Sequence, residues 1–142
     1  MMQIECCDNL ELMSKIESGT VDLIYCDLLY GTGRKFADYQ DLKPIRSEIE
    51  AHYLPRLKEM HRVLKSTGSI YLHCDWRINH WIRCIMDDVF GYERMLNELI
   101  WCYRSQGFNK NKWSEKHDVI LLYSKGKNYT FNLEAVRENE IG

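Results

Sequence analysis

One apolar run constrains the fold of this chain more than any other segment. Residues 21–26 are β-branched or aromatic at half of their positions and show no polar alternation. Such a run is typical of a strand buried on both faces of a parallel sheet. Asp27, Leu28, Leu29, Tyr30 and Gly31 follow directly. In open α/β sheets, ligands bind beyond the carboxyl ends of the strands, so this carboxylate and ring are well placed for chemistry. A solvated turn is the simpler interpretation of an isolated aspartate. The rest of the chain has to decide between a solvated turn and a ligand site.

The composition indicates one globular domain spanning residues 1–142. Its 45% hydrophobic and 28% charged content is ordinary, and a net charge of -2 gives no global argument for nucleic acid. Because no apolar stretch is long enough for a membrane span and the N-terminus lacks the features of a signal peptide, we expect a cytoplasmic protein. The six cysteines lack CxxC spacing and fall mostly in apolar runs, which favours buried reduced thiols over disulfides or zinc.

Hydrophobic periodicity predicts strands that alternate with helices. Pro55 is expected to kink or restart the second helix, and Gly68 to end it. Residues 34–43 are predicted to be a polar loop, mobile unless it orders over a ligand. The expected elements are a strand at 4–7, a helix capped by Asp8 and Asn9 and running to Ile16, a helix from the Ser47/Glu50 capping box, a strand at 70–74, a helix at 78–90, a strand at 96–103, a hairpin of 117–124 with 129–132, and a frayed end at 133–142.

The order of these elements predicts where polar side chains meet. Because strand–helix–strand crossovers are right-handed, Asp27, Asp75 and Tyr103 should lie along one edge of one sheet. That edge is the candidate site. His73 and Cys74 should point to opposite faces of their strand, which argues against a metal site. His61 is expected to pack at the edge of the core.

Residues 101–127 differ in character from the rest of the chain. Six cations face two acids there, with aromatic residues interleaved. Positive side chains beside aromatic rings suit a nucleic-acid backbone and an unstacked base, although a solvated basic loop fits equally well. The residues of this region that we expect to bind nucleic acid are Arg104, Lys110, Lys112 and Trp113.

Four segments together resemble the catalytic half of amino-methylating, site-specific DNA methyltransferases, in the class where the target-base motif precedes the cofactor motif. They are Cys7-Asp8-Asn9-Leu10, the run 21–31, Arg62-Val63-Leu64-Lys65-Ser66-Thr67-Gly68-Ser69-Ile70-Tyr71, and Asn97-Glu98-Leu99-Ile100-Trp101 with His117-Asp118-Val119-Ile120-Leu121. The resemblance implies an α/β, partial doubly wound (Rossmann-like) sheet, mostly parallel with a C-terminal antiparallel hairpin. It also implies a methyltransferase that acts on DNA with S-adenosylmethionine, as in restriction-modification systems.

The resemblance assigns roles to the residues after the first run. The motif of the family is Asp-Pro-Pro-Tyr or Asp-Pro-Pro-Phe, and Asp27 and Tyr30 occupy its outer positions. Asp27 and the carbonyl of Leu28 would accept hydrogen bonds from the exocyclic amine of a flipped base, and Tyr30 would stack on that base. Aspartate, where cytosine-modifying relatives tend to carry serine, favours adenine. Asp8 and Asp27 would contact the cofactor.

Two departures from the family pattern are expected to matter. Leu28 and Leu29 replace both prolines, which should cost rigidity of roughly 0.4 to 1 kcal/mol per site and add two amide donors without partners. We therefore expect reduced activity. The chain also ends before the target-recognition region and the Phe-x-Gly-x-Gly cofactor loop of the family, so we expect weak cofactor binding and association with itself or with a complementary half. A non-catalytic nucleic-acid-binding remnant and a structural or decayed fragment remain alternatives.

Overall fold

A mixed four-stranded sheet forms the centre of the chain. The computed structural model describes residues 2–105, 107 and 109–137. The strands are β1 (Val21–Asp27), β2 (Leu64–Asp75), β3 (Met95–Cys102) and β4 (His117–Ser124), in the order β1-β2-β4-β3. β1 pairs in parallel with β2, whereas β4 pairs antiparallel with both β2 and β3. The expected α/β methyltransferase-like sheet is therefore present, with its antiparallel pairing supplied by β4.

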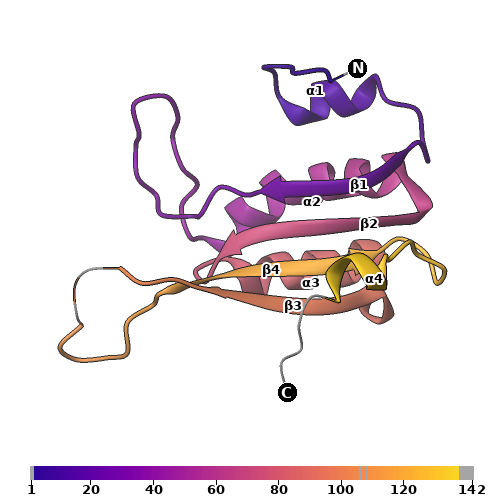
Figure 1. Cartoon of the computed structure of the whole chain (residues 1–142). Coiled ribbons are helices and arrows are strands. Elements are labelled where there is room, and N and C mark those ends of the chain that lie inside the picture. Colours follow the sequence, from indigo (N-terminus) through magenta and orange to yellow (C-terminus); the bar gives the residue numbers. More distant parts are fainter. Residues whose placement is uncertain (1, 106, 108, 138–142) are drawn as a thin grey trace.

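The insertion of β4 between β2 and β3 determines which strand ends meet. β2 and β3 both run antiparallel to β4, so they are parallel to each other without touching. The carboxyl ends of β1, β2 and β3 and the start of β4 therefore share one edge of the sheet, at the left of Figure 1. This confirms that Asp27, Asp75 and Tyr103 lie along one edge.

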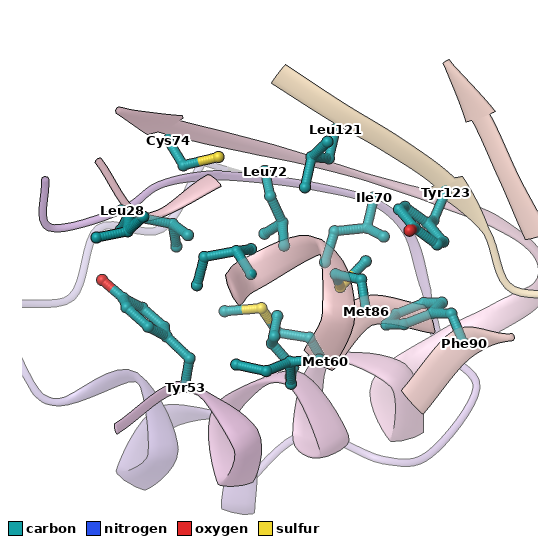
Figure 2. Close-up of a cluster of buried hydrophobic side chains, with 14 of the residues drawn as sticks. Leu28, Tyr53, Met60, Ile70, Leu72, Cys74, Met86, Phe90, Leu121 and Tyr123 are labelled. Carbon is teal, nitrogen blue, oxygen red and sulfur yellow. The ribbon is translucent and has the colours of Figure 1, made fainter. Parts of the chain in front are cut away.

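Two long helices cover one face of the sheet (Figure 1). They are α2 (Arg46–Val63) and α3 (Asn79–Phe90), and the 3-10 turn η1 (Tyr92–Arg94) leads from α3 into β3. Their apolar sides pack on Ile70 and Leu72 of β2 and on Leu121 of β4, all 0–1% exposed. Leu28, just beyond β1, joins the same core, as Figure 2 shows. The core thus fixes the position of the segment that follows β1.

The opposite face of the sheet is largely open. The register places Leu23 and Tyr25 of β1 on this face with Leu99 and Trp101 of β3, and all four side chains are 42–61% exposed. The prediction that residues 21–26 are buried on both faces is therefore wrong for this chain, because β1 is an edge strand with helices on one side only. Its apolar character cannot by itself distinguish a central strand from an edge strand.

The N-terminal segment is partly as expected. The helix α1 (Asn9–Ser14) begins after Asp8, whose side chain accepts a hydrogen bond from the N–H of Leu10 at 2.8 Å. The strand expected at 4–7 is absent, and these residues are exposed and unpaired with β1. Leu10 and Met13 of α1 and Ile16 just beyond it face the core, as their spacing predicts. The helix ends at Ser14, however, and does not reach Ile16.

The second helix differs from its sequence-based expectation at three points. It begins at Arg46 after Ile45, without a side-chain cap, so the Ser47/Glu50 capping box does not form. Pro55 lies inside one continuous helix on its exposed side. Burial of Ile49, Tyr53, Leu57, Met60 and Val63 in one stripe outweighs the cost of roughly 3 kcal/mol for an internal proline.

Gly68 does not end a helix but lies within β2. A Cβ there would come within 3.0 Å of the carbonyl oxygen of Asp22, at the point where the β1–β2 register shifts. The absence of a side chain therefore permits a close strand approach, and this role of the glycine overrides its helix-stop signal.

Of the two strands predicted in the C-terminal part, one is present and one is not. β4 has the expected bounds, but residues 129–132 form no second strand. Instead the N–H of Thr130 bonds to the carbonyl of Thr67, and the short helix α4 (Leu133–Val136) follows where a frayed end was expected. Residues 138–142 of that expected end lie outside the described residues.

Two general expectations can be compared with the structure. All six cysteines are free, but only Cys74 is buried and Cys26 half-buried, so the prediction of burial is wrong for Cys6, Cys7, Cys84 and Cys102. Cys84 lies on the exposed side of α3 and Cys102 at the end of the edge strand β3, whereas Cys6 and Cys7 lie in the exposed segment before α1. Within residues 2–105, 107 and 109–137, no helix has the length and apolar character that a membrane crossing requires.

Candidate active site

Hydrogen bonds hold the turn after β1 at Leu28 and Leu29, the two positions where the family motif has proline. The N–H of Leu28 donates to the carbonyl of His73 at 2.9 Å, which extends the β1–β2 pairing by one residue. The N–H of Leu29 donates to the hydroxyl of Tyr53 on α2, also at 2.9 Å. The expectation that these two amides lack partners is therefore wrong. A strand neighbour and a buried tyrosine accept them instead.

Asp41 fixes the second half of the same turn. Its carboxylate, 2% exposed, accepts hydrogen bonds from the N–H groups of Gly31 and Thr32 and from the hydroxyl of Thr32. Gly31 has a φ of +68°, and a Cβ there would lie 2.5 Å from Ile78. Only glycine fits this position. The loop 34–43 thus reaches back to order the turn.

A cleft of about 230 Å³ opens beside this turn. The loop 34–43, expected to be mobile unless ordered by a ligand, forms one wall, and its Phe36 and Tyr39 rings stack with centroids 4.8 Å apart. The cleft is lined by Asp27, Leu28, Leu29, Tyr30, Thr32, Phe36, Tyr39 and Asp41. All four residues expected to be catalytic therefore border one cavity.

Asp27 and Tyr30 differ in their exposure. The Asp27 side chain is 61% exposed at the end of β1, whereas Tyr30 is half-buried. Burial, together with the negative charges of Asp27 and Asp118, raises the pKa of Tyr30 to about 12. Tyr30 is therefore a neutral ring over the whole physiological pH range.

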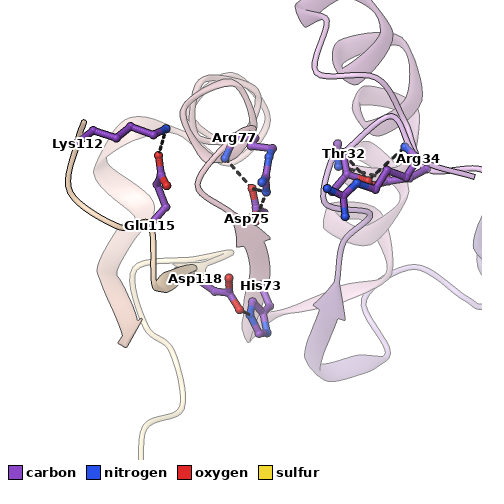
Figure 3. Close-up of polar contacts among 10 residues, drawn as sticks. Thr32, Arg34, His73, Asp75, Arg77, Lys112, Glu115 and Asp118 are labelled. Carbon is purple, nitrogen blue, oxygen red and sulfur yellow. Dashed lines mark hydrogen bonds and ion pairs between the residues drawn. The ribbon is translucent and has the colours of Figure 1, made fainter. Parts of the chain in front are cut away.

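The rest of the edge is rich in acids whose charges are partly compensated (Figure 3). The guanidinium of Arg77 donates to both oxygens of Asp75 at 2.8 Å. Asp118, at the start of β4, lies 3.1 Å from Nε2 of His73. Burial and the charges of Asp118 and Asp75 raise the pKa of Tyr103. The edge therefore suits a cation or a group that donates hydrogen bonds.

His73 is a site residue that the sequence raised only as a rejected metal ligand. Its side chain lies on the open face while that of Cys74 faces the core, as the strand alternation predicts. Its ring contacts the hydroxyl of Tyr25 and the carboxylate of Asp118, and its centroid lies 6.2 Å from that of Tyr30. The available signal was its position, two residues before the end of a strand whose last residue, Asp75, was already a candidate. Within the described residues, no group of three or more His, Cys, Asp or Glu could hold a metal ion.

Asp8 lies apart from the residues that line this cleft. Its carboxylate caps α1 and forms an ion pair with Arg56 of α2 at 2.6 Å. The hydrogen bond from the N–H of Leu10, followed by the Arg56 charge, holds the pKa of Asp8 below its usual range. The expected contact between Asp8 and the cofactor stays a prediction.

The residues expected to bind nucleic acid lie in the loop between β3 and β4, which starts from the same edge of the sheet (Figure 1). Arg104 and Lys110 are exposed, and Trp113 is 96% exposed. Lys112 pairs with Glu115 and lies 5.7 Å from the centroid of the Trp76 ring. Phe108, a further aromatic of this loop, lies outside the described residues. The basic loop and the cleft lie at one edge of the sheet, and DNA binding by these residues stays a prediction.

The architecture described above is the fold of solved DNA methyltransferases. The cytosine-N4-specific PvuII DNA methyltransferase superposes with a TM-score of 0.67 at 15% identity, over 93% of this chain and 52% of that one. A putative DNA modification methylase from Thermus thermophilus, complexed with S-adenosyl-L-methionine, gives 0.62 at 16% identity, over 92% and 58%. At such identities the likeness establishes the fold.

The sequence narrows the class further. The DNA methylase family of N6/N4 methyltransferases matches residues 21–140, so the chain belongs to this family. It is 35% identical to the type II methyltransferase M.EcaI of Enterobacter cloacae over 82% of this chain and 27% of that protein. It is 30% identical to M.HpaI of Haemophilus parainfluenzae and to the DNA adenine methyltransferase YhdJ of Escherichia coli K12, over 93% and 91% of this chain. The chain spans 42% and 43% of those two proteins.

Proposed function

We propose that this chain carries the base-binding and methyl-accepting site of a DNA methyltransferase that acts on exocyclic amines, adenine N6 rather than cytosine N4. The observation that carries the proposal is the cleft lined by Asp27, Leu28, Leu29 and Tyr30 at the carboxyl end of β1. Aspartate at position 27 favours adenine, and one relative is by name a DNA adenine methyltransferase.

Three residues of the cleft, Asp27, Leu28 and Tyr30, would have defined roles. Asp27 and the carbonyl of Leu28 accept the two N–H groups of the amine, which keeps the nitrogen lone pair directed away from the ring. Tyr30, neutral and half-buried, stacks on the base. Stacking offsets part of the few kcal/mol needed to take the base out of the duplex. Catalysis then rests on positioning, since no covalent bond to the protein is needed.

The cofactor that fits this chemistry is S-adenosylmethionine, which supplies an electrophilic methyl group. The acidic edge formed by Asp27, Asp75 and Asp118 suits its sulfonium cation. Asp8 and Asp27 are the residues proposed to contact it. We propose that the 142-residue chain alone binds it weakly, because Asp8 already serves a helix cap and an ion pair. Isothermal titration that shows tight stoichiometric binding would contradict this point.

The test is a single-turnover assay with the chain in excess over DNA and a saturating methyl donor. Mass spectrometry of the digested DNA should find N6-methyladenine, and Asp27→Ala should abolish it while the protein still melts cooperatively. The appearance of N4-methylcytosine alone would refute the choice of adenine. DNA binding without any methylation would instead favour the alternative of a non-catalytic nucleic-acid-binding remnant.

We also propose that methyl transfer is slow with Leu28 and Leu29 in the motif. Two restrictions on φ are lost, although the hydrogen bonds to His73 and Tyr53 restore part of the order. Replacing both leucines with proline should raise the single-turnover rate. An unchanged or lower rate would show that the hydrogen bonds already hold the turn in its active shape.

The exposed edge strand favours a second polypeptide segment in the working enzyme. Among the described residues, no strand pairs with the outer edge of β1, and its Leu23 and Tyr25 are each 58% exposed. Unpaired apolar edges readily pair with further strands. We propose that β1 associates with a second copy or with a complementary methyltransferase half. Light scattering can test both forms of association at about 100 µM, a concentration at which weak complexes form. A monomeric mass for the chain alone, and no increase in mass after mixing with a complementary half, would exclude both.

A further inference from the structure

His73 is held at the centre of a chain of three side chains next to the proposed base-binding acid. It pairs with Asp27 across the β1–β2 register, and its side chain is only 16% exposed. Nδ1 lies 2.8 Å from the hydroxyl of Tyr25 and 3.9 Å from Oδ1 of Asp27, while Nε2 lies 3.1 Å from Oδ2 of Asp118. Figure 3 shows the His73 ring directed at Asp118.

These partners determine the tautomer of His73. An ionised carboxylate only accepts hydrogen bonds, so Nε2 must carry the proton and donate to Asp118. In the neutral ring Nδ1 then has a lone pair, which accepts the hydroxyl proton of Tyr25. The basic nitrogen is thus bonded to Tyr25, with Asp27 as its next polar neighbour at 3.9 Å. The far side of the ring is anchored by an acid that would stabilise an imidazolium. This is the arrangement that orients a general base in other enzymes.

Methyl transfer to an amine releases a proton that needs an acceptor. The exocyclic nitrogen forms a bond to the methyl carbon as that carbon separates from sulfur, leaving the electron pair on sulfur. The nitrogen must then lose one proton to become a neutral secondary amine. Asp27 is the nearest acceptor, and it must pass the proton on before its carboxylate can again accept a hydrogen bond from the amine of the next base.

We propose that His73 relays this proton. The Tyr25 hydroxyl turns its proton away from Nδ1, Nδ1 takes the proton from Asp27, and the imidazolium that forms pairs with Asp118 until it releases the proton to water. His73 acts through Asp27 and is therefore a positioning residue, and the inference rests on the function proposed above. The 3.9 Å separation is longer than a hydrogen bond. Such contacts often tighten only when substrate binds, or one water bridges them.

The first test reports on the relay without any methylation. Proton NMR of the chain should show a downfield, slowly exchanging His73 Nε2 proton, assigned by ¹⁵N coupling, that is lost in Asp118→Ala and retained in Tyr25→Phe. A proton on Nδ1 in the unsubstituted chain would overturn the proposal. The signal requires the hydrogen bond to Asp118, and a solvated histidine would not give it.

The second test separates proton relay from structural support. Gln at position 73 keeps an N–H donor for Asp118 but has no basic nitrogen. His73→Gln should lower kcat by about 10²-fold and leave the KM for DNA unchanged, because proton transfer to a positioned base contributes that much. His73→Ala should regain activity when imidazole is added. The exposed histidine of α3 gives a matched control, His80→Gln, which should retain full activity.

The outcomes distinguish this proposal from the function on which it rests. A kcat of His73→Gln within threefold of the unsubstituted chain would overturn the relay and leave the methyltransferase intact. Loss of all methylation in the unsubstituted chain would instead refute the proposed function, and the NMR measurement would still decide whether the Tyr25–His73–Asp118 chain exists in solution.

Discussion

The hydrogen bond between Leu29 and Tyr53 predicts an energetic coupling that can be measured. Tyr53 is 3% exposed, and its hydroxyl accepts the N–H of Leu29 at 2.9 Å and reaches the carbonyl of the same residue at 3.4 Å. Tyr53→Phe removes the hydroxyl acceptor and leaves the N–H of Leu29 without a hydrogen-bond partner. A buried donor without a partner costs about 1–3 kcal/mol, and the partial burial of Leu29 places the expected loss near the lower limit.

Proline at position 29 has no N–H, so the same tyrosine substitution should cost much less in a Leu29→Pro background. A double-mutant cycle should therefore give a coupling free energy of about 1 kcal/mol. Urea denaturation with a constant m-value provides the four free energies of unfolding. Tyr123→Phe is the matched control, because the hydroxyl of that buried tyrosine bonds to Asp87 on α3 and should not couple to position 29. A Tyr53–Leu29 coupling below about 0.3 kcal/mol, the usual error of additivity, would refute the reasoning.

Three further predictions follow from charge and exposure. Because the folded chain holds the pKa of Tyr30 near 12, stability linked to this group is complete below pH 10 and is lost as pH rises toward 12; Tyr30→Phe should remove a late step from the tyrosinate absorbance titration. Burial, with a smaller contribution from Lys125, lowers the pKa of His61 below its ordinary value of 6.5, so stability should fall as pH drops below 6.5, and His61→Gln should flatten this loss in urea denaturation curves measured between pH 7 and 5. Trp113→Ala should weaken single-stranded DNA binding by about 1–3 kcal/mol without changing the dependence of log K on log salt concentration, whereas Lys110→Ala should reduce that slope by about one. Fluorescence anisotropy at several salt concentrations measures both quantities, and a slope changed by Trp113→Ala but not by Lys110→Ala would contradict the prediction.

The sequence predicts the sheet edge well, because local pattern and topology agree there. The apolar run before Asp27, the strand ending at Asp75 and the strand 117–124 were all recognisable from their residues. The crossover from β1 to β2 was enough to bring Asp27 and Asp75 to one edge, where the antiparallel strand β4 begins. The N-cap at Asp8 and the helix α3 were likewise set by local signals.

The errors arise where tertiary contacts override local signals. Pro55 is tolerated because buried side chains on both sides of it belong to one stripe, and Gly68 serves a close strand approach that only the folded sheet reveals. The exposure of Leu23 could not be read from its residue type, since an edge strand and a central strand can have the same composition. The acceptor for Leu29 comes from a tyrosine in another element, so no local rule could have supplied it.

The acceptors of the turn after β1 also change how this chemistry can be recognised in other chains. Where two prolines restrict the backbone of the motif, its sequence signature consists of four consecutive residues. Here the order comes from residues outside the motif. The hydroxyl of Tyr53, 24 positions after Leu29, accepts the N–H of Leu29, and the buried carboxylate of Asp41, ten positions after Gly31, accepts the N–H of Gly31. A search that demands the prolines would overlook such a chain, whereas one that accepts any residue there and asks for Tyr53 and Asp41 at these separations would retain it.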